Sequence, residues 1–150
     1  MVSQTAVVPE QDIAVSMLVH ATDGMPALLV DGVLRTIQAF AENGPPSKRV
    51  VDWNGSWWSG WGINDLVPMG GKVMVALPGQ LNPFLDAAEI TVTGPDTGRI
   101  SKAGGFGSHG ETARLVRNRA GAVTEIWLGG ARLLRQAAAA KEARARYVKT

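Results

Sequence analysis

The strongest constraint on the fold is the segment from Arg49 to Leu134, in which the apolar residues follow no helical period. Short runs rich in Val, Ile, Thr and Trp alternate there with Gly, Asn, Asp and Pro, the residues that tight turns require. We count about seven or eight such runs, a number typical of antiparallel barrels. Closure removes the exposed strand edges that lead to aggregation, so the segment predicts a closed or nearly closed antiparallel β-barrel.

Turn residues and the alternation of side chains predict where individual strands lie and which way their side chains face. Gly70-Gly71 separates GWGINDLVPM from KVMVALP as a two-residue hairpin turn, because glycine tolerates positive φ at both positions. In AVTEIWLGG, we expect Thr124, Ile126 and Leu128 to share the inward face of a strand. Trp127 then lies on the outer face, where we expect the helix of the N-terminal region to cover it.

The N-terminal region has a different pattern. Met1–Gln11 is polar and irregular, which predicts a frayed end. Ile13–His20 is a short apolar run rich in Val, and it predicts a buried strand. Met25–Asn43 has apolar residues at helical spacing, with Pro26 in the first turn and Gly44-Pro45-Pro46 as a stop signal. We expect this helix to cover KVMVALP, since both faces of that strand are apolar.

These patterns divide the α+β chain into three parts. Residues 1–46 supply the strand and the long helix, and residues 47–136 form the barrel against which that helix packs. Residues 137–150 are rich in Ala and Arg and predict a basic helical tail on the surface.

Composition narrows the classes of function. Residues 1–98 carry four Lys and Arg against ten Asp and Glu, whereas residues 99–150 carry eleven against three. We interpret this as opposed acidic and basic faces rather than a nucleic-acid surface, which usually has a higher net charge and interleaved aromatics. With no cysteine and only two histidines, we expect no metal or cofactor. We find no signal peptide and no apolar run long enough to span a membrane, so a cytoplasmic location is the default expectation.

Four of the five tryptophans lie in WNGSWWSGWG, residues 53–62. Strand alternation puts Trp53 and Trp57 on one face and Trp58 on the other, with Trp61 rejoining the first face after Gly60. We favour a core role over a stacking platform, because a core divides large rings between two faces. If the barrel leaves a cavity, then Trp57, Trp58 and Trp61 are candidate ligand contacts.

Three polar residues complete the candidate site. Asp65 lies among apolar residues and is either a polar anchor in a cavity or, as we favour, part of a turn or a salt bridge. His109 and Glu111 stand in Ser108-His109-Gly110-Glu111, where a hydroxyl, an imidazole and a carboxylate are close in sequence. Adjacent residues on a strand point to opposite faces, so we favour a structural role at the start of a strand over catalysis.

Longer motifs carry a resemblance to a known family. DWNGSWWSGWGINDLVPMGGKVMVALPGQLNPFLDAAEITVT and GFGSHGETARLVRNRAGAVTEIWLGG contain W-x-G-x-W-W, G-x-x-D-L-V-P, N-P-F-x-D-A-x-E-I and H-G-E-x-x-R. They resemble the C-terminal lipocalin-like barrel of bacterial β-lactamase-like and penicillin-binding serine hydrolases, which include D-aminopeptidases and esterases. Upstream, IAVSMLVHATDG and the helix after it resemble the last strand and terminal helix of the catalytic domain. The resemblance covers roughly residues 12 to 135.

The resemblance implies an accessory role without catalysis. The family's chemistry needs a Ser-x-x-Lys nucleophile, which this chain lacks, and a Tyr-x-Asn element that its single tyrosine, Tyr147, does not provide. The implied function is a barrel that packs on a hydrolase and shapes access to its active site through Pro78–Asp86 and Ala103–Gly110. The partner is then a catalytic domain, or a second copy of the chain. The alternative is a stand-alone lipocalin-like binder of a small apolar ligand, and an independent enzyme is the weakest of the three hypotheses.

Overall fold

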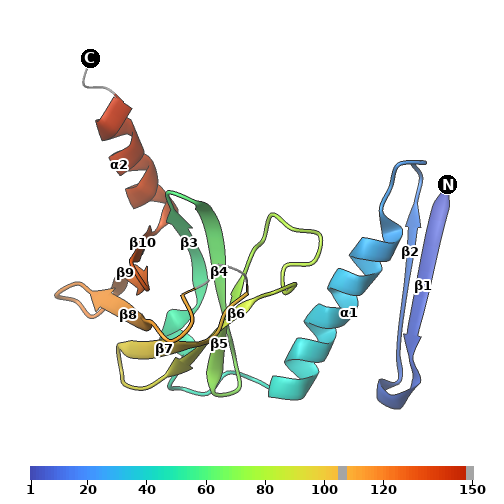
Figure 1. The fold of residues 1–150 in the computed structure, drawn as a ribbon, viewed down its shortest axis with the longest axis horizontal. Coiled ribbons are helices and arrows are strands. Elements are labelled where there is room, and N and C mark those ends of the chain that lie inside the picture. The colour runs from blue at the N-terminus through green and yellow to red at the C-terminus, as the bar shows by residue number, and fades with distance from the viewer. Residues whose placement is uncertain (105–107, 148–150) are drawn as a thin grey trace.

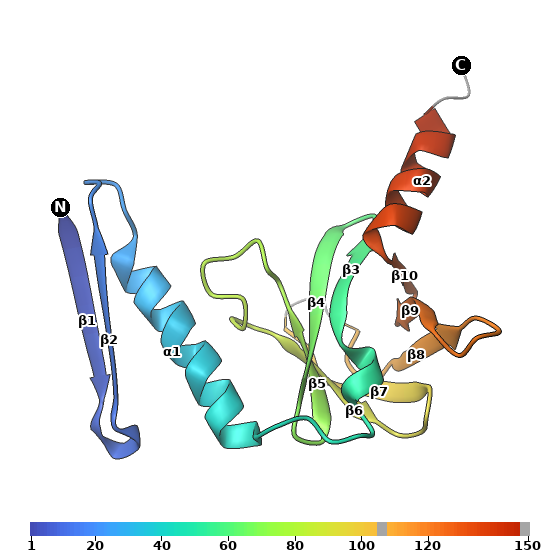
Figure 2. The ribbon, with the colours of Figure 1, turned by 180° about the vertical axis from the view of Figure 1, so that it is seen from behind.

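The computed structural model describes residues 1–104 and 108–147, and it has two parts that lie side by side. In Figure 1 a two-stranded hairpin stands at one side, a long helix lies in the middle, and a β-barrel with a second helix forms the rest. Figure 2 shows the same order from behind. The chain is α+β and mainly β, as the sequence predicts.

Eight antiparallel strands form a closed barrel in the order β10-β3-β4-β5-β6-β7-β8-β9, which confirms the predicted closure. β10 pairs with both β9 and β3, and it thereby closes the ring. The strands are β3 (Gly55–Ser59), β4 (Gly62–Met69), β5 (Lys72–Ala76), β6 (Ala88–Val92), β7 (Thr97–Lys102), β8 (Thr112–Arg117), β9 (Val123–Leu128) and β10 (Ala131–Leu134).

Large side chains fill the centre of the barrel. Trp53, Trp57, Val73, Ile90 and Ile126 have no exposed surface. Trp53 ends a short 3₁₀ helix, η2 (Val51–Trp53), that precedes the first barrel strand. Burying one such side chain contributes about 1.5–3 kcal/mol, so these residues dominate the stability of the barrel.

The predicted alternation holds in the later strands, with one exception. In β8, Ala113 and Leu115 are buried while Arg114 between them is exposed. In β9, Ile126 is buried, but Thr124 is exposed rather than inward-facing. The register between β8 and β9 shifts next to Arg117, so the first residues of β9 do not continue the inward face of the strand.

The hairpin turn at Gly70-Gly71 is confirmed, because β4 ends at Met69 and β5 begins at Lys72. Gly70 has φ 52°, a left-handed conformation that favours glycine. A Cβ atom at this position would also overlap the carbonyl oxygen of Asn43 at the end of the long helix. This glycine therefore permits both the turn and the close approach of the helix to the barrel.

The predicted frayed end is wrong. Val2–Val8 forms strand β1, which pairs along its whole length with β2 (Ile13–Val19). The short 3₁₀ helix η1 (Pro9–Gln11) and Asp12, in the left-handed conformation at φ 52°, connect the two strands. Ser3, Gln4 and Thr5 made the segment look irregular, but a hairpin with one solvated face accepts such residues.

Strand β2 is also less buried than predicted. Its side chains alternate between half-buried and exposed, with Ala14, Ser16 and Leu18 on the exposed face. No residue of β1 or β2 reaches the burial of the barrel core. Strand β2 therefore carries more apolar side chains than its half-exposed position among the described residues requires.

The long helix α1 (Pro26–Asn43) matches its predicted position. It packs against the barrel mainly at β4 and the loop after β5, and it covers β5 itself only in part, where Ala39 packs in a cluster with Met74. The backbone of Gly32 approaches the carbonyl oxygen of Leu81 so closely that a Cβ would overlap it. Next to this contact, the Asn82 side-chain amide donates a hydrogen bond of 2.7 Å to the Asp31 carboxylate. Further along, Ala39 packs with Met69 and other apolar residues on the outer side of the barrel.

The expectation that α1 covers Trp127 is wrong. α1 packs beside β4 and the loop after β5, whereas β9 lies on the other side of the barrel (Figure 1). Trp127 is half-buried between its neighbours in the sheet, Arg114 and Arg132. The long side chains of arginine at such positions can cover apolar surface with their stems.

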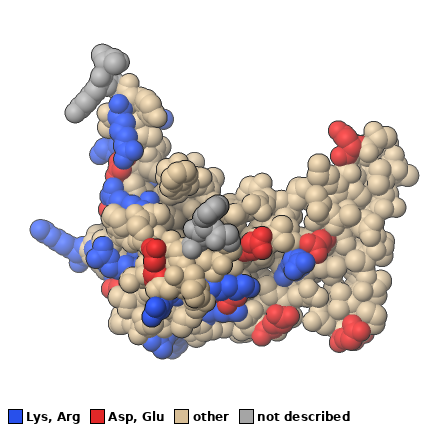
Figure 3. Space-filling model, in the orientation of Figure 1, with Lys and Arg blue, Asp and Glu red and all other residues tan. Residues whose placement is uncertain are grey.

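The second helix, α2 (Gln136–Tyr147), lies on the surface as predicted and has no buried residue. Arg132 ties it to the barrel by donating a hydrogen bond of 2.8 Å to Glu142. On the face shown in Figure 3, Lys and Arg gather over α2 and the neighbouring barrel, and Asp and Glu predominate on the part with the hairpin and α1. Within residues 1–104 and 108–147, no helix is long and apolar enough to cross a membrane.

One ion-pair cluster on the outer face of the barrel gives stability a pH dependence. Glu89 in β6 accepts a hydrogen bond of 2.8 Å from Lys72 and lies 3.5 Å from the Lys102 ammonium. Burial raises the pKa of Glu89, but the hydrogen bond and charge of Lys72, together with Lys102, outweigh it and hold the pKa below its usual value.

We predict that Glu89→Gln lowers the free energy of unfolding most above about pH 5. A carboxyl whose pKa is lowered on folding stabilises the protein above its unfolded pKa, and this contribution disappears as the pH falls through the folded pKa. Urea unfolding of both proteins between about pH 3 and pH 7 would show the difference shrinking on acidification. The control is Glu10→Gln, which makes the same substitution in the exposed turn η1. A difference that is constant with pH would contradict the role of Glu89.

Candidate functional site

Four connections meet at one end of the barrel, which we call the mouth. Because consecutive strands are antiparallel, alternate connections lie at the same end. The mouth carries the β3–β4 turn, the loop 77–87, the segment between β7 and β8, and the β9–β10 turn. The residues Gly105, Phe106 and Gly107 of the predicted contact segment Ala103–Gly110 lie outside the described residues.

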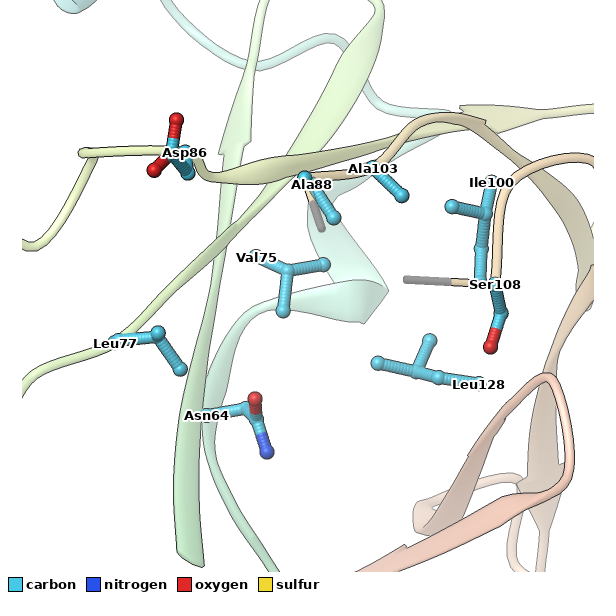
Figure 4. Close-up of a pocket in the computed structure, with 10 residues that line it drawn as sticks. Asn64, Val75, Leu77, Asp86, Ala88, Ile100, Ala103, Ser108 and Leu128 are labelled. Atoms are coloured by element: carbon cyan, nitrogen blue, oxygen red, sulfur yellow. The ribbon is translucent and has the colours of Figure 1, made fainter. Parts of the chain in front are cut away.

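A cavity of about 210 Å³ opens at the mouth (Figure 4). Its centre is surrounded by the side chains of Val75, Ala88, Ile100 and Leu128, which come from four strands and face inward. Its other lining residues are Asn64, Leu77, Asp86, Ala103, Gly104 and Ser108. The residues 88, 103 and 104 are small, and the space exists because no large side chain fills it from these positions.

The chemistry of this cavity is that of an apolar pocket with a few polar groups at its margin. Asn64 supplies an amide and Ser108 a hydroxyl, while the carboxylate of Asp86 points away from the centre in Figure 4. Among the described residues, no group of three His, Asp, Glu or Cys side chains could hold a metal ion. The cavity suits a small apolar molecule, or an apolar side chain of a partner.

The predicted tryptophans do not line this cavity. Trp57 is fully buried in the core, and the guanidinium of Arg135 lies 3.7 Å from the centre of its ring. Trp58 faces outward and borders a groove against α2. Trp61 is 96% exposed, and the prediction that it rejoins the face of Trp57 is wrong. Strand alternation ends at Ser59, where the chain enters the turn that presents Trp61 to solvent.

Asp65 is also placed differently from the favoured prediction. It lies within β4, opposite Ser56 and Ala76, and not in a turn. Its Oδ1 atom is buried and has no hydrogen-bond partner within the described residues. Its neighbour Asn64 lines the cavity instead, because adjacent strand residues point to opposite sides.

His109 and Glu111 lie at the start of a strand, as predicted, because β8 begins at Thr112. The backbone N–H of Glu111 donates to the carbonyl of Ser108 at 3.0 Å, and that of Gly110 donates to Ile100 at 2.8 Å. These bonds fold the segment into a tight turn before β8, with exposed side chains at positions 109 and 111. Of Ser108, His109 and Glu111, the cavity lining includes only Ser108.

Exposed apolar side chains surround the mouth on one side. Leu77, Leu81 and Leu85 belong to the loop 77–87 and are 39–47% exposed, Ile63 at the start of β4 is 41% exposed, and Trp61 is 96% exposed. We call these five residues the apolar rim. The loop is held in place by buried Asn82, which binds Asp31 of α1, and by a backbone hydrogen bond of 3.0 Å from Leu77 to Pro83.

The opposite end of the barrel is charged. Arg117 donates hydrogen bonds of 2.6 Å to Asp96 and 2.7 Å to Asp52, and these bonds, that to Asp96 first, raise the pKa of Arg117. Lys48 and Arg49 border the open, polar hollow beside this group. Within the described residues the two ends of the barrel therefore differ in character: the mouth combines a cavity with an apolar rim, whereas the hollow at the opposite end is bordered by charged side chains.

Sequence reasoning missed most of the residues that line the cavity. Val75, Ala88 and Ile100 are ordinary apolar positions in strands, and nothing in the sequence marks them as the border of an empty space. Leu128 was predicted to face inward, and that signal was correct. The loop Pro78–Asp86, which the sequence analysis predicts to contact a partner, contains two of the five rim residues, Leu81 and Leu85.

We predict that Arg135→Ala destabilises the protein by about 1–2 kcal/mol, because it removes the cation–π contact and uncovers the ring of Trp57. Partial burial of the guanidinium lowers the pKa of Arg135. Urea denaturation followed by tryptophan fluorescence measures the change. Arg144→Ala, on the exposed surface of α2, should alter stability by less than about 0.5 kcal/mol. Equal effects of the two substitutions would contradict a specific role for Arg135.

Comparisons with known proteins do not assign the chain to a family. No protein-family model matches it, and no curated protein and no solved structure matches it significantly. The closed eight-stranded barrel, its small cavity and its apolar rim are therefore the observations from which a function can be argued.

Proposed function

We propose that this chain is a non-catalytic accessory barrel of a β-lactamase-like serine hydrolase, and that it docks on the catalytic domain through the apolar rim at its mouth. The motifs quoted above support the family. The observation that carries the docking is that the loop 77–87, the β3–β4 turn and the start of β4 expose large apolar side chains at one end of the barrel.

The rim has the properties of a docking surface. Trp61 is almost fully exposed, and a tryptophan is among the side chains that contribute most when a partner buries it. The loop 77–87 is already fixed to α1 through Asp31 and Asn82, so docking orders little additional chain. The charged opposite end, with Arg117 and its two carboxylate partners, is a poorer candidate for an apolar interface.

We propose that the chain is not catalytic because it lacks the sequence motifs that the family's active site needs. Ser108 is the serine at the cavity, but it is followed by His109, Gly110 and Glu111 and not by a lysine three residues on. A serine nucleophile needs a base within hydrogen-bond reach. The accessory barrel would therefore contribute shape to an active site and leave the chemistry to the catalytic domain.

The test is a titration of the chain with a β-lactamase-like catalytic domain from which its own C-terminal barrel has been deleted. We predict that Leu85→Glu weakens binding at least about tenfold, because it places a charge in the apolar interface. The matched control is Val51→Glu, since Val51 is similarly exposed, at 49% against 47% for Leu85, but lies at the opposite end of the barrel.

Three results would overturn the accessory role. The first is the absence of any binding by the unaltered chain, and the second is an equal loss of binding in the two glutamate variants. The third is hydrolysis of a nitrophenyl ester or of nitrocefin by the chain alone, which would make it an enzyme in its own right.

The cavity supports a second candidate function, a stand-alone lipocalin-like binder of a small apolar ligand. Trp57, Ile90 and Ile126 fill the centre of the barrel, and the apolar space available to a ligand among the described residues lies at the mouth. Its 210 Å³ suits a molecule of one or two rings, because apolar cavities of roughly 150 Å³ already bind benzene.

For this candidate we predict that the chain binds indole and that Ala88→Leu abolishes binding by filling the cavity. Chemical shifts of the lining residues would report the titration by NMR. Thr91→Leu is the matched control, because Thr91 lies on the exposed face of the same strand and should leave binding unchanged. Failure of the unaltered chain to bind indole or benzene would remove this candidate.

A further inference from the structure

Arginine and tryptophan side chains alternate across the outer face of one side of the barrel. Trp127 in β9 is paired with Arg114 in β8 and with Arg132 in β10, so these three residues form one row. Arg114 and Arg132 are exposed, and Trp127 is half-buried. Because paired residues of neighbouring strands project from the same face of a sheet, the indole lies between two arginine positions.

The row continues onto β3 through Trp58. β10 pairs with β3 at Leu134 and Trp58, and Arg132 lies two residues before Leu134, on the same side of the strand. Arg132 and Trp58 both line a groove of about 200 Å³ between the barrel and α2, and Arg146 of α2 borders the same groove. We call five residues the Arg–Trp stripe: Arg114, Trp127, Arg132, Trp58 and Arg146.

The two ends of the stripe carry positive charge that no carboxylate offsets by direct contact. Arg132 donates hydrogen bonds of 3.0 Å to Glu125 and 2.8 Å to Glu142, so two carboxylates offset its charge and hold its guanidinium in place. Among residues 1–104 and 108–147, neither Arg114 nor Arg146 forms an ion pair. These two arginines can therefore contact an anionic ligand on either side of Arg132.

The charge of the surroundings also favours an anionic ligand on this side of the molecule. Residues 99–150 carry eleven Lys and Arg against three Asp and Glu. In Figure 3 basic residues gather over α2 and the neighbouring barrel, whereas acidic residues predominate over the hairpin and α1. A polyanion is therefore attracted to the side of the stripe and repelled from the part with the hairpin.

We propose that the Arg–Trp stripe binds single-stranded nucleic acid. Aromatic side chains on the outer face of a sheet or small barrel stack with unpaired bases, and neighbouring arginines contact the phosphates. The stripe offers both groups in alternation, and each nucleotide brings one base and one phosphate. β8 and β3 are three strand spacings apart, roughly 14 Å, which a few nucleotides can span.

Strand pairing is what assembles the stripe. Its members are separated along the chain, so the sequence shows no basic stripe with interleaved aromatic residues, and we therefore expected no nucleic-acid surface. In the closed barrel β8, β9, β10 and β3 are neighbours, and their pairing brings the arginines beside the tryptophans.

A single strand fits the stripe better than a duplex or a lipid surface. A duplex hides the faces of its bases inside the stack, so the two indoles would contribute no stacking to its binding. Membrane binding needs apolar side chains that insert among the lipids, whereas Trp58 and Trp127 are half-buried in the sheet. A half-buried indole still offers one face to an unpaired base.

The experiment titrates the whole chain into a fluorescein-labelled oligodeoxythymidine of about twelve nucleotides, within the range of site sizes of small barrels, and measures anisotropy. We predict that Arg146→Ala weakens binding at least about fivefold and reduces the slope of log Kd against log salt by about 0.7, because one phosphate contact is lost. Arg144→Ala is the matched control, since it removes the same charge from the same helix but does not border the groove.

A second variant separates stacking from charge. Trp127→Leu should weaken binding at least about fivefold without changing the salt slope, because it removes a stacking surface and no charge. Thermal unfolding shows whether the variant is folded, and Trp58→Leu takes its place if it is not.

Each outcome bears on the inference. Weaker binding by Arg146→Ala and by the tryptophan variant, with Arg144→Ala close to the unaltered chain, supports it. Absence of binding at low salt, or equal effects of the two arginine substitutions, overturns it. Tighter binding to a duplex of the same length, or to phosphatidylglycerol vesicles at the same phosphate concentration, overturns it in favour of that ligand. No residue of the stripe belongs to the apolar rim, so the result does not depend on the docking proposed there.

Discussion

Closure of the barrel by β10 is the constraint on which the rest of the structure depends. β10 has four residues and pairs with β9 on one side, while a single residue pair, Leu134 with Trp58, joins it to β3. Leu133 and Leu134 are buried, and Arg135 follows them to cover the ring of Trp57. Without this short strand β3 and β9 would both be open edges, and the core between them would be exposed to water.

Closure also explains why the candidate site is at one end. Side chains such as Trp53, Ile90 and Ile126 fill the centre of the barrel. Among the described residues, small residues at the mouth border the cavity. The same end carries the loop 77–87, which α1 holds through Asp31 and Asn82. Helix α1 therefore contacts both the β1–β2 hairpin and the loop 77–87, which carries part of the apolar rim.

The sequence was sufficient for the elements that depend on local patterns. Frequent turn residues predicted the barrel, helical spacing with Pro26 and Gly44 predicted α1, and Gly70-Gly71 predicted a hairpin turn that the structure confirms. Sequence patterns failed where the position of a residue depends on contacts with residues far away in the chain. β1 was missed because its polar side chains obscured a strand that only β2 makes possible. The position of Trp61 was predicted wrongly because a turn interrupts strand alternation. The cavity was not predicted because no sequence pattern marks an unfilled space between ordinary apolar residues.

The single residue pair between β3 and β10 has a kinetic consequence. Trp58 and Leu134 are far apart in the chain, and loop-closure entropy opposes their contact until the strands between them are in place. Every other pair of neighbouring barrel strands is adjacent in sequence and can form as a local hairpin. Folding should therefore proceed by zipping from β3 to β9, with the β3–β10 seam made last. By the same reasoning, this seam is where a thermally opened barrel first admits water.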